Sequence, residues 1–239
     1  MKKIILFLFL ILLISCKNDS QKKNIDKIEN EEFTKVKIEK VNDSKKNEQK
    51  DEEINLINFN IEYIKSKTSK LTENINVDSI NIKELNKIPK EFLKKYISSH
   101  KIDFGYPEYL PVDYPESYSF YQFKEFENFF LFTIIHQNEF CCQTLYAVTT
   151  EKNEISIINI SVIGFVGADG GWKGKRFGKW FNEFGIGSTL INFYDEDLDE
   201  NTKNVEIDST WSEYEFSKNG IIKNIEHHQV KYKGNKQIE

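Results

Sequence analysis

The chain has 239 residues, the size of one domain with extensions, and its formal net charge is −5. Its 38 acidic residues outnumber the 33 basic ones, and Arg176 is the only arginine in the sequence. Because nucleic-acid binders depend on a basic surface and on the forked guanidinium groups of arginine, this composition argues against a nucleic-acid partner.

The N-terminus has the pattern of a bacterial signal peptide. Two lysines precede an apolar run over residues 4–14, which is too short to cross a bilayer, since a spanning helix needs about 20 residues. The run leads into Leu-Ile-Ser-Cys, which matches a lipobox, the motif in which the cysteine thiol receives a diacylglycerol before the leader is cut. We therefore predict a signal peptide over residues 1–15 and a lipid on Cys16. The alternative is an ordinary secretory signal in which this cysteine is incidental.

A lipidated cysteine would hold the mature chain on the outer membrane, because several acyl chains acting together form a stable anchor. The lipid bilayer is therefore one expected partner. Residues 17–20 (KNDS) lack the acidic cluster that would argue for export to the cell surface, so the sequence favours a periplasm-facing position over a surface-exposed one. Removal of the leader takes away two lysines and no acid, which leaves the mature chain more negative.

Polar and charged residues dominate from residue 17 to about residue 53. Such a segment cannot bury enough apolar surface to offset the entropy that its backbone would lose on folding. We predict a lipidated, unstructured tether over residues 16–53, a single domain over residues 54–232 and a short C-terminal tail over residues 233–239.

Two helices are predicted ahead of the strands. Isoleucines recur at helical spacing over residues 54–64, and a second helix follows Pro89, whose missing N–H suits the start of a helix. The second helix carries Phe92, Leu93, Tyr96 and Ile97 on one face. Aromatic and aliphatic residues at this spacing predict packing against a sheet rather than a binding role. Prolines at 107, 111 and 115 then predict an extended connector.

Segments rich in aromatic and β-branched residues follow, which is typical of antiparallel strands. They cover residues 118–126, 129–136, 143–150, 155–164, 188–194, 205–216 and 221–232. Residues 129–135 are apolar on both faces, which predicts a central strand. In the strand from Val205 the apolar residues change from odd to even positions, which predicts a bulge or bend near Ser212. The predicted fold class is α+β, with short N-terminal helices packed on one face of a meander sheet of about seven antiparallel strands.

The cysteines and histidines show no metal-binding or catalytic spacing. Cys141 and Cys142 are adjacent, and neighbouring side chains on a strand point to opposite faces, so we expect two free thiols; a vicinal disulfide is the alternative. The four histidines fit neither a zinc motif nor a nucleophile context. The sequence therefore predicts no catalytic residues.

The glycine-rich stretch over residues 164–176 does not match a phosphate-binding loop, because no Gly-Lys-Ser/Thr stands at the required spacing. We predict a long loop between strands. Its aromatic and basic residues are also those of loops that bind glycans or anions, so the alternative is a ligand or partner surface. The residues of this predicted surface are Trp172, Lys173, Lys175, Arg176 and Trp180, with Lys179 beside them.

An acidic stretch begins at residue 195. Oxygen-bearing side chains at Asp195, Asp197 and Asp199, followed by Glu206 at position 12, match the ligand spacing of a calcium loop. The match is incomplete, since position 6 is Glu200 where a calcium loop needs glycine, and the flanking segments read as strands. Calcium is the one cofactor that the sequence offers, and an acidic hairpin loop is the alternative.

Four features together resemble small uncharacterised lipoproteins of Bacteroidetes, flavobacteria especially. They are the lipobox, the polar tether, the element LNKIPKEFLKKY at residues 85–96 and the hairpin YEFSKNGII at residues 214–222. The resemblance covers residues 82–232 and implies a helix followed by a meandering antiparallel sheet. It implies no activity.

The sequence favours a non-enzymatic binding or interaction module of the cell envelope, whose partner is an envelope protein or a glycan. This hypothesis requires Trp172 and Trp180 to be exposed. Three alternatives stay open: a calcium-dependent module, an immunity lipoprotein against a secreted toxin, and a hydrolase with unrecognised residues. A hydrolase would need a deep cleft with at least two convergent polar groups.

Overall fold

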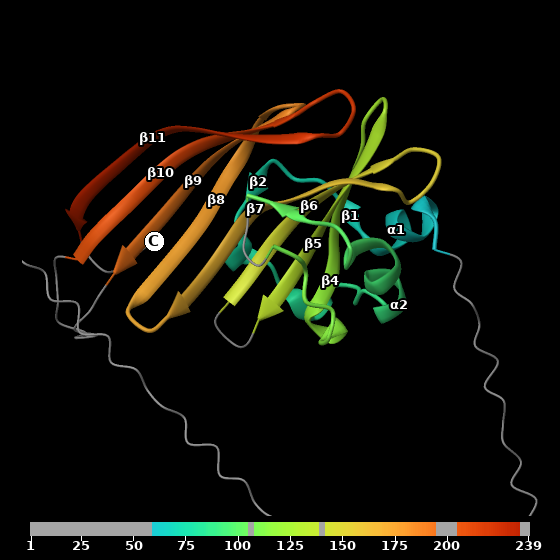
Figure 1. The fold of residues 1–239 in the computed structure, drawn as a ribbon, viewed down its shortest axis with the longest axis horizontal. Coiled ribbons are helices and arrows are strands. Elements are labelled where there is room, and N and C mark those ends of the chain that lie inside the picture. Colours follow the sequence, from blue (N-terminus) through green and yellow to red (C-terminus); the bar gives the residue numbers. More distant parts are fainter. Residues whose placement is uncertain (1–58, 105–107, 139–141, 195–204, 235–239) are drawn as a thin grey trace, which may run out of the picture. The chain divides into compact units, whose positions relative to one another are not determined.

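The computed structural model describes residues 59–104, 108–138, 142–194 and 205–234. The predicted signal peptide, the predicted lipid attachment at Cys16 and the predicted tether lie outside these ranges. All the described residues belong to one unit, Ile54–Glu239, which is built mainly of β-strands with a few short helices (Figure 1). The coarse α+β class is therefore confirmed, while the number of strands and the places of the helices differ from the prediction.

Eight long strands in the described residues form a meander, in which each strand pairs antiparallel with the next. They are β4 (Tyr118–Glu125), β5 (Phe129–Asn138), β6 (Cys142–Glu151), β7 (Ile157–Asp169), β8 (Trp172–Asn182), β9 (Gly185–Tyr194), β10 (Val205–Phe216) and β11 (Ile222–Gly234). The predicted strands correspond to all of these except β8. The last strand also runs two residues into the predicted tail.

Three two-residue strands extend the sheet: β1 (Ser69–Lys70) pairs parallel with β4, β2 (Asn74–Ile75) pairs antiparallel with β8, and β3 (Ile102–Asp103) pairs parallel with β7. Strands β2 and β3 pair with β8 and β7 at positions where these two strands do not pair with each other. The predicted sheet was wholly antiparallel, so the parallel pairs are a correction.

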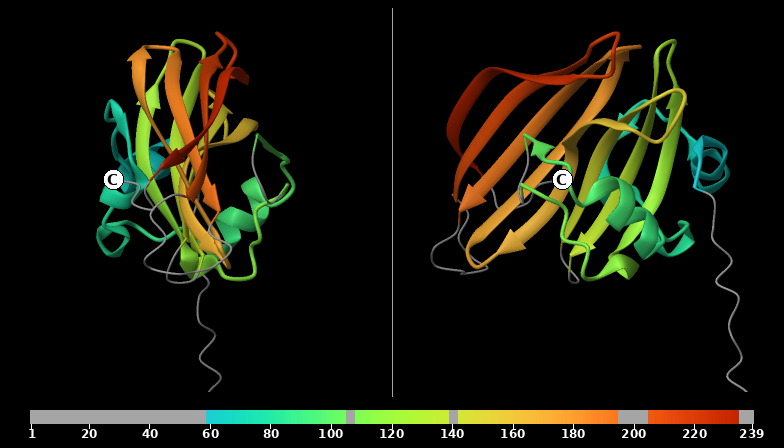
Figure 2. Two further views of the ribbon diagram at one scale, coloured as in Figure 1. Left: turned by 90° about the vertical axis from the view of Figure 1, so that its left-hand side faces the viewer. Right: turned by 45° about the vertical axis from the view of Figure 1, so that its right-hand side comes forward.

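The sheet divides where β7 and β8 separate. These strands pair only near their common hairpin, from Phe165–Arg176 to Asp169–Trp172, and diverge beyond it (Figure 1). We call β1, β3 and β4–β7 the first arm, and β2 and β8–β11 the second arm. Figure 2 shows the two arms from two further sides.

The helices pack on one face of the first arm. They are α1 (Ile61–Lys67), α2 (Lys90–Phe92) and η3 (Leu93–Ile97), with the single turns η1 (Val77–Ser79), η2 (Ile82–Glu84) and η4 (Pro115–Ser117) elsewhere. Helix α1 begins after Asn60, whose side-chain oxygen accepts a hydrogen bond from the Tyr63 N–H at 2.8 Å. The helix predicted after Pro89 is confirmed, and its apolar residues are buried against β4 and β5. The helix predicted over residues 54–64 is displaced, since among the described residues it begins at Ile61 and runs to Lys67.

The opposite face of the first arm is covered by the second arm and by residues 71–85. Side chains from β5, β6 and β7 meet Trp180, Ile186, Tyr214 and Phe216 there in a second buried cluster. The Tyr214 hydroxyl joins the arms by donating to the Val162 carbonyl at 2.8 Å. Because both faces of β5 are covered, residues 129–136 are all buried, and the predicted central strand is confirmed.

The irregularity predicted near Ser212 is confirmed. The register between β10 and β11 shifts between Trp211 and Ser212, and the extra residue is His227 on β11. On its other side, β10 pairs with β9 without a break. The register shift is therefore confined to the pairing with β11. The change from odd to even apolar positions reflects a change in which face of β10 is covered.

Cys142 forms a disulfide. The prediction of two free thiols is therefore wrong for this residue, while Cys141 lies outside the described ranges. Cys142 stands opposite Asn138 at the end of the described pairing between β5 and β6, so the alternation rule for residues inside a strand does not decide its bonding.

Candidate ligand-binding cleft

The glycine-rich stretch is a β-hairpin between β7 and β8 and not a long loop. The chain turns at Gly170, whose φ of 57° lies in the left-handed region that glycine tolerates. Alternation along β8 places Trp172, Arg176 and Trp180 on one face, and Lys173 and Lys175 on the other. The predicted common surface of these five residues is therefore wrong, since two faces of one strand share them.

Trp172 is half-buried because its indole lies flat on the hairpin. Gly167 and Gly174 are paired across the two strands, and a Cβ on Gly167 would be 3.5 Å from the indole. A Cβ on Gly174 would overlap the same ring and would stand 2.8 Å from the Asn192 side-chain oxygen. That oxygen accepts a hydrogen bond from the indole Nε1 at 3.3 Å. These two glycines make room for an indole, which explains part of the glycine pattern without a phosphate.

Gly174→Ala is expected to lower the free energy of unfolding by about 1–3 kcal/mol, because the added methyl group overlaps the Trp172 ring. Gly187→Ala on β9 is the matched control, since the nearest atom to its Cβ would be 3.7 Å away. Urea denaturation of both variants measures the difference. Equal stability of the two would show that the indole does not lie over Gly174.

Arg176 is also buried, with 8% of its surface exposed. Its guanidinium carbon lies 5.6 Å from the Tyr214 ring centroid, and its Nε and Nη1 atoms have no hydrogen-bond partner among the described residues. Burial lowers the pKa of this guanidinium, while the charge of Glu226 acts in the opposite direction. Arg176 is therefore not part of an exposed basic surface.

Trp180 has 7% of its surface exposed and stands at the end of the core between the arms. Its ring packs against Phe216 with centroids 4.9 Å apart, and its backbone N–H donates to the Glu73 carbonyl at 2.9 Å. The indole Nε1 is buried and has no hydrogen-bond partner in the described part of the chain. A buried N–H without an acceptor is rare in proteins and calls for an explanation.

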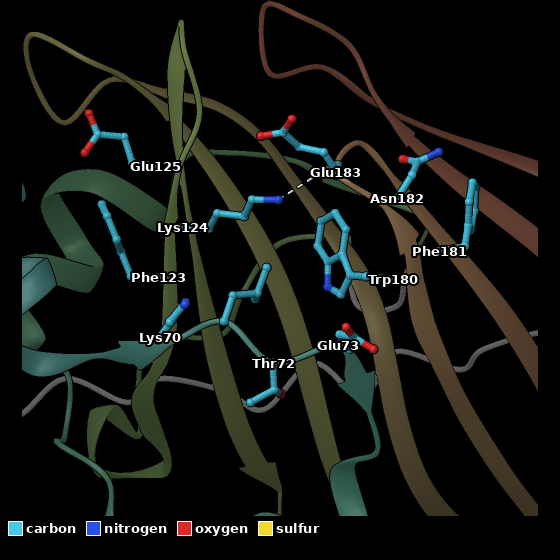
Figure 3. Close-up of a pocket in the computed structure, with 11 residues that line it drawn as sticks. Lys70, Thr72, Glu73, Phe123, Lys124, Glu125, Trp180, Phe181, Asn182 and Glu183 are labelled. Carbon is cyan, nitrogen blue, oxygen red and sulfur yellow. Dashed lines mark hydrogen bonds between the residues drawn. The ribbon is translucent and has the colours of Figure 1, made fainter.

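A cleft of about 620 Å³ opens beside Trp180, between the end of β4 and the hairpin that joins β8 to β9 (Figure 3). Its floor is the segment that leads from β1 to β2. The lining residues are Lys70, Leu71, Thr72, Glu73, Phe123, Lys124, Glu125, Trp180, Phe181, Asn182 and Glu183. The divergence of the two arms is what leaves this space open.

Lys124 reaches across the cleft from the first arm to the second (Figure 3). Its Nζ donates to the Glu183 carbonyl at 3.1 Å and lies 4.4 Å from the Phe126 ring centroid and 5.3 Å from the Trp180 ring. Burial lowers the pKa of this ammonium, and the charge of Glu183 partly offsets that effect. The cleft therefore holds a cation that has lost part of its water.

The charges around the cleft leave a positive balance near Lys124. Glu125 lies within salt-bridge distance of Lys65 and Lys152, and Glu73 lies 3.5 Å from Lys179. Lys70 and Lys124 form no ion pair within the described ranges, and neither does Glu183, so two ammonium groups face one unpaired carboxylate of the lining. With aromatic walls and two ammonium groups, the arrangement can bind an organic ligand that carries an apolar group and a negative charge.

The predicted calcium ligands Asp195, Asp197 and Asp199 lie outside the described residues. Glu206 is exposed on β10, 4.0 Å from the Lys231 ammonium. Among the described residues, no group of three or more histidine, cysteine, aspartate or glutamate side chains is placed to hold a metal ion.

Sequence reasoning singled out Trp180 but missed Lys124, Phe123 and the segment at Thr72. Lys124 lies in a strand of alternating polar and apolar residues, where a lysine is typically solvated, and its neighbours in the cleft come from the second arm.

In the described part of the chain, no helix is long and apolar enough to cross a membrane. The chain matches no protein-family model, and neither a curated protein nor a solved structure shows significant similarity to it.

Proposed function

We propose that this chain is a non-enzymatic binding protein of the bacterial cell envelope, held on a membrane by lipid on Cys16, and that its ligand occupies the cleft between the arms. The observation that carries the proposal is the ammonium of Lys124, which lies across an open cleft near the Phe126 and Trp180 rings and forms no ion pair within the described residues. The lipobox supports the location, and the disulfide at Cys142 agrees with an oxidising compartment.

The ligand class follows from the groups that line the cleft. Phe123 and Trp180 offer apolar faces to a hydrocarbon or aromatic group. Lys124 supplies a partly desolvated ammonium, which binds a carboxylate by a charge-assisted hydrogen bond. The proposed ligand is therefore an organic acid with an apolar group, such as the end of an envelope peptide.

Lys124→Met is expected to weaken the binding of N-acetyl-alanyl-phenylalanine by at least about tenfold, because the ligand carboxylate loses a charged donor. Methionine keeps an unbranched stem of similar length against the Phe126 and Trp180 rings. Isothermal titration calorimetry of the full mature chain in detergent measures the affinity.

Two controls separate the cleft from general charge effects. Lys94→Met removes an exposed lysine of η3 and should leave the affinity unchanged. The C-terminal amide of the same dipeptide lacks the carboxylate, so it should bind the wild type more weakly than the acid does. It should bind Lys124→Met and the wild type with equal affinity. If aromatic and aliphatic carboxylates all fail to bind, or bind Lys124→Met as well as the wild type, the cleft is not the site.

A further inference from the structure

A second hollow lies on the outer face of the second arm. It measures about 810 Å³ and is lined by β8, β9 and β10 together with Glu73. Two of its walls are aromatic side chains with large exposed surfaces, Trp211 at 42% and Phe181 at 54%. Phe181 stands between this hollow and the cleft and lines both of them (Figure 3). Exposed aromatic side chains that line the same hollow add to one apolar surface, which is a feature of binding surfaces.

The floor of this hollow exists because β9 has a glycine at position 187. Gly187 pairs with Lys179 on β8 and with Glu213 on β10, so a side chain there would stand in the middle of the hollow. A Cβ at this position would meet no atom closer than 3.7 Å, and its φ is not in the left-handed region. Neither the backbone conformation nor close packing requires glycine at this position. Glycine is required only if the floor of the hollow has to stay open.

Glu213 is held in place at the edge of the hollow. Its Oε2 lies 3.3 Å from the His227 Nε2, and the His227 ring stacks on Trp211 with centroids 4.4 Å apart. His227 is the extra residue of the bulge, so the irregularity in β11 puts this ring over Trp211. An oriented carboxylate beside an exposed indole offers a fixed acceptor next to an apolar face.

The charges around the hollow disfavour an anion. Lys179 lies 3.5 Å from Glu73, which offsets its charge, and Glu213 adds a negative one. The hydroxyl of Thr189, between Phe177 and Trp211 on this face, adds a neutral donor and acceptor. Stacking faces combined with fixed polar groups suit a ring that has C–H bonds on one face and hydroxyls around its edge.

We propose that this hollow binds a neutral saccharide, with a sugar ring stacked on Trp211 and its hydroxyls donating to Glu213. The site is separate from the proposed cleft and does not depend on it. Since Glu73, Trp180 and Phe181 line both spaces, the two sites are tested by residues that they do not share.

The test titrates the full mature chain with neutral tetrasaccharides of glucose, mannose and N-acetylglucosamine, in a polyoxyethylene detergent that carries no sugar. Tryptophan fluorescence and calorimetry report binding. At least one tetrasaccharide should bind, and both Trp211→Ala and Gly187→Leu should weaken its binding at least about tenfold, the first by removing the stacking face and the second by filling the floor. Circular dichroism verifies that both variants are folded.

Tyr114→Ala removes an aromatic side chain that is 70% exposed and is not in the hollow, so it should bind like the wild type. Lys124→Met should also retain saccharide binding. The proposal is overturned if no tetrasaccharide binds at roughly 10 mM, or if Trp211→Ala binds as well as the wild type. It is also overturned if only tetramethylammonium binds, because the hollow would then be an aromatic cage for a cation.

Discussion

Phe92→Ala is expected to lower the free energy of unfolding by about 3–5 kcal/mol, the range for a fully buried phenylalanine truncated to alanine. Phe92 has no exposed surface, and its ring contacts those of Phe120 at 5.2 Å and Phe132 at 6.4 Å. It thereby joins helix α2 to β4 and β5. The loss lies toward the lower end of this range if the partly buried rings of Phe59 and Tyr96, which contact Phe92, move into the space.

Urea denaturation followed by circular dichroism measures this loss. Tyr114→Ala is the matched control, because it truncates an aromatic side chain that is 70% exposed, and it should change stability by less than about 1 kcal/mol. A similarly small change for Phe92→Ala would mean that the helix after Pro89 does not pack on the sheet.

The packing of this helix could be predicted from the sequence. Pro89 defines its start, and the spacing of Phe92, Leu93, Tyr96 and Ile97 leaves one apolar face. The central strand could be predicted as well, because an unbroken apolar run such as residues 129–135 is stable only when both faces are covered. Both predictions rest on patterns within one segment, and the residues that form these patterns are buried in the structure.

Strand β8 could not be predicted by the same reasoning. Two glycines and four basic residues between Trp172 and Trp180 lower the strand propensity of this segment. Gly174 is required by a ring that lies over it, and Arg176 is enclosed by residues distant in sequence. The Trp172 ring lies over Gly174 only once the strand has formed, and the contact of Arg176 with Tyr214 is tertiary, so propensity alone indicates a loop and an exposed arginine.

The two candidate sites depend on topology in the same way. The cleft forms because β7 and β8 separate beyond Arg176, and this brings Lys124 next to a hairpin about sixty residues away in sequence. The hollow forms because β8, β9 and β10 align Phe177, Thr189 and Trp211 in one row. No spacing within a single segment reveals either arrangement.

Acid is expected to destabilise the domain through His136. This side chain is buried, its ring stacks on Tyr118 with centroids 4.2 Å apart, and burial lowers its pKa to about 4. In the unfolded chain a histidine has a pKa of about 6.5, so the unfolded state binds the proton more tightly. Stability from this residue is therefore complete above about pH 6.5 and is lost as the pH falls toward 4.

The gap between the two pKa values corresponds to about 3 kcal/mol. On acidification, the free energy of unfolding of the wild type should fall by about this much more than that of His136→Phe. Phenylalanine keeps a ring against Tyr118 but cannot take a proton, so the variant should lose less stability than the wild type between pH 6.5 and 4. Urea denaturation across this pH range gives both curves. His228→Gln, which changes an exposed histidine of β11, should follow the wild type. Parallel curves for wild type and His136→Phe would show that His136 is hydrated enough to be protonated in the folded chain, and the acid sensitivity would then have to come from other groups.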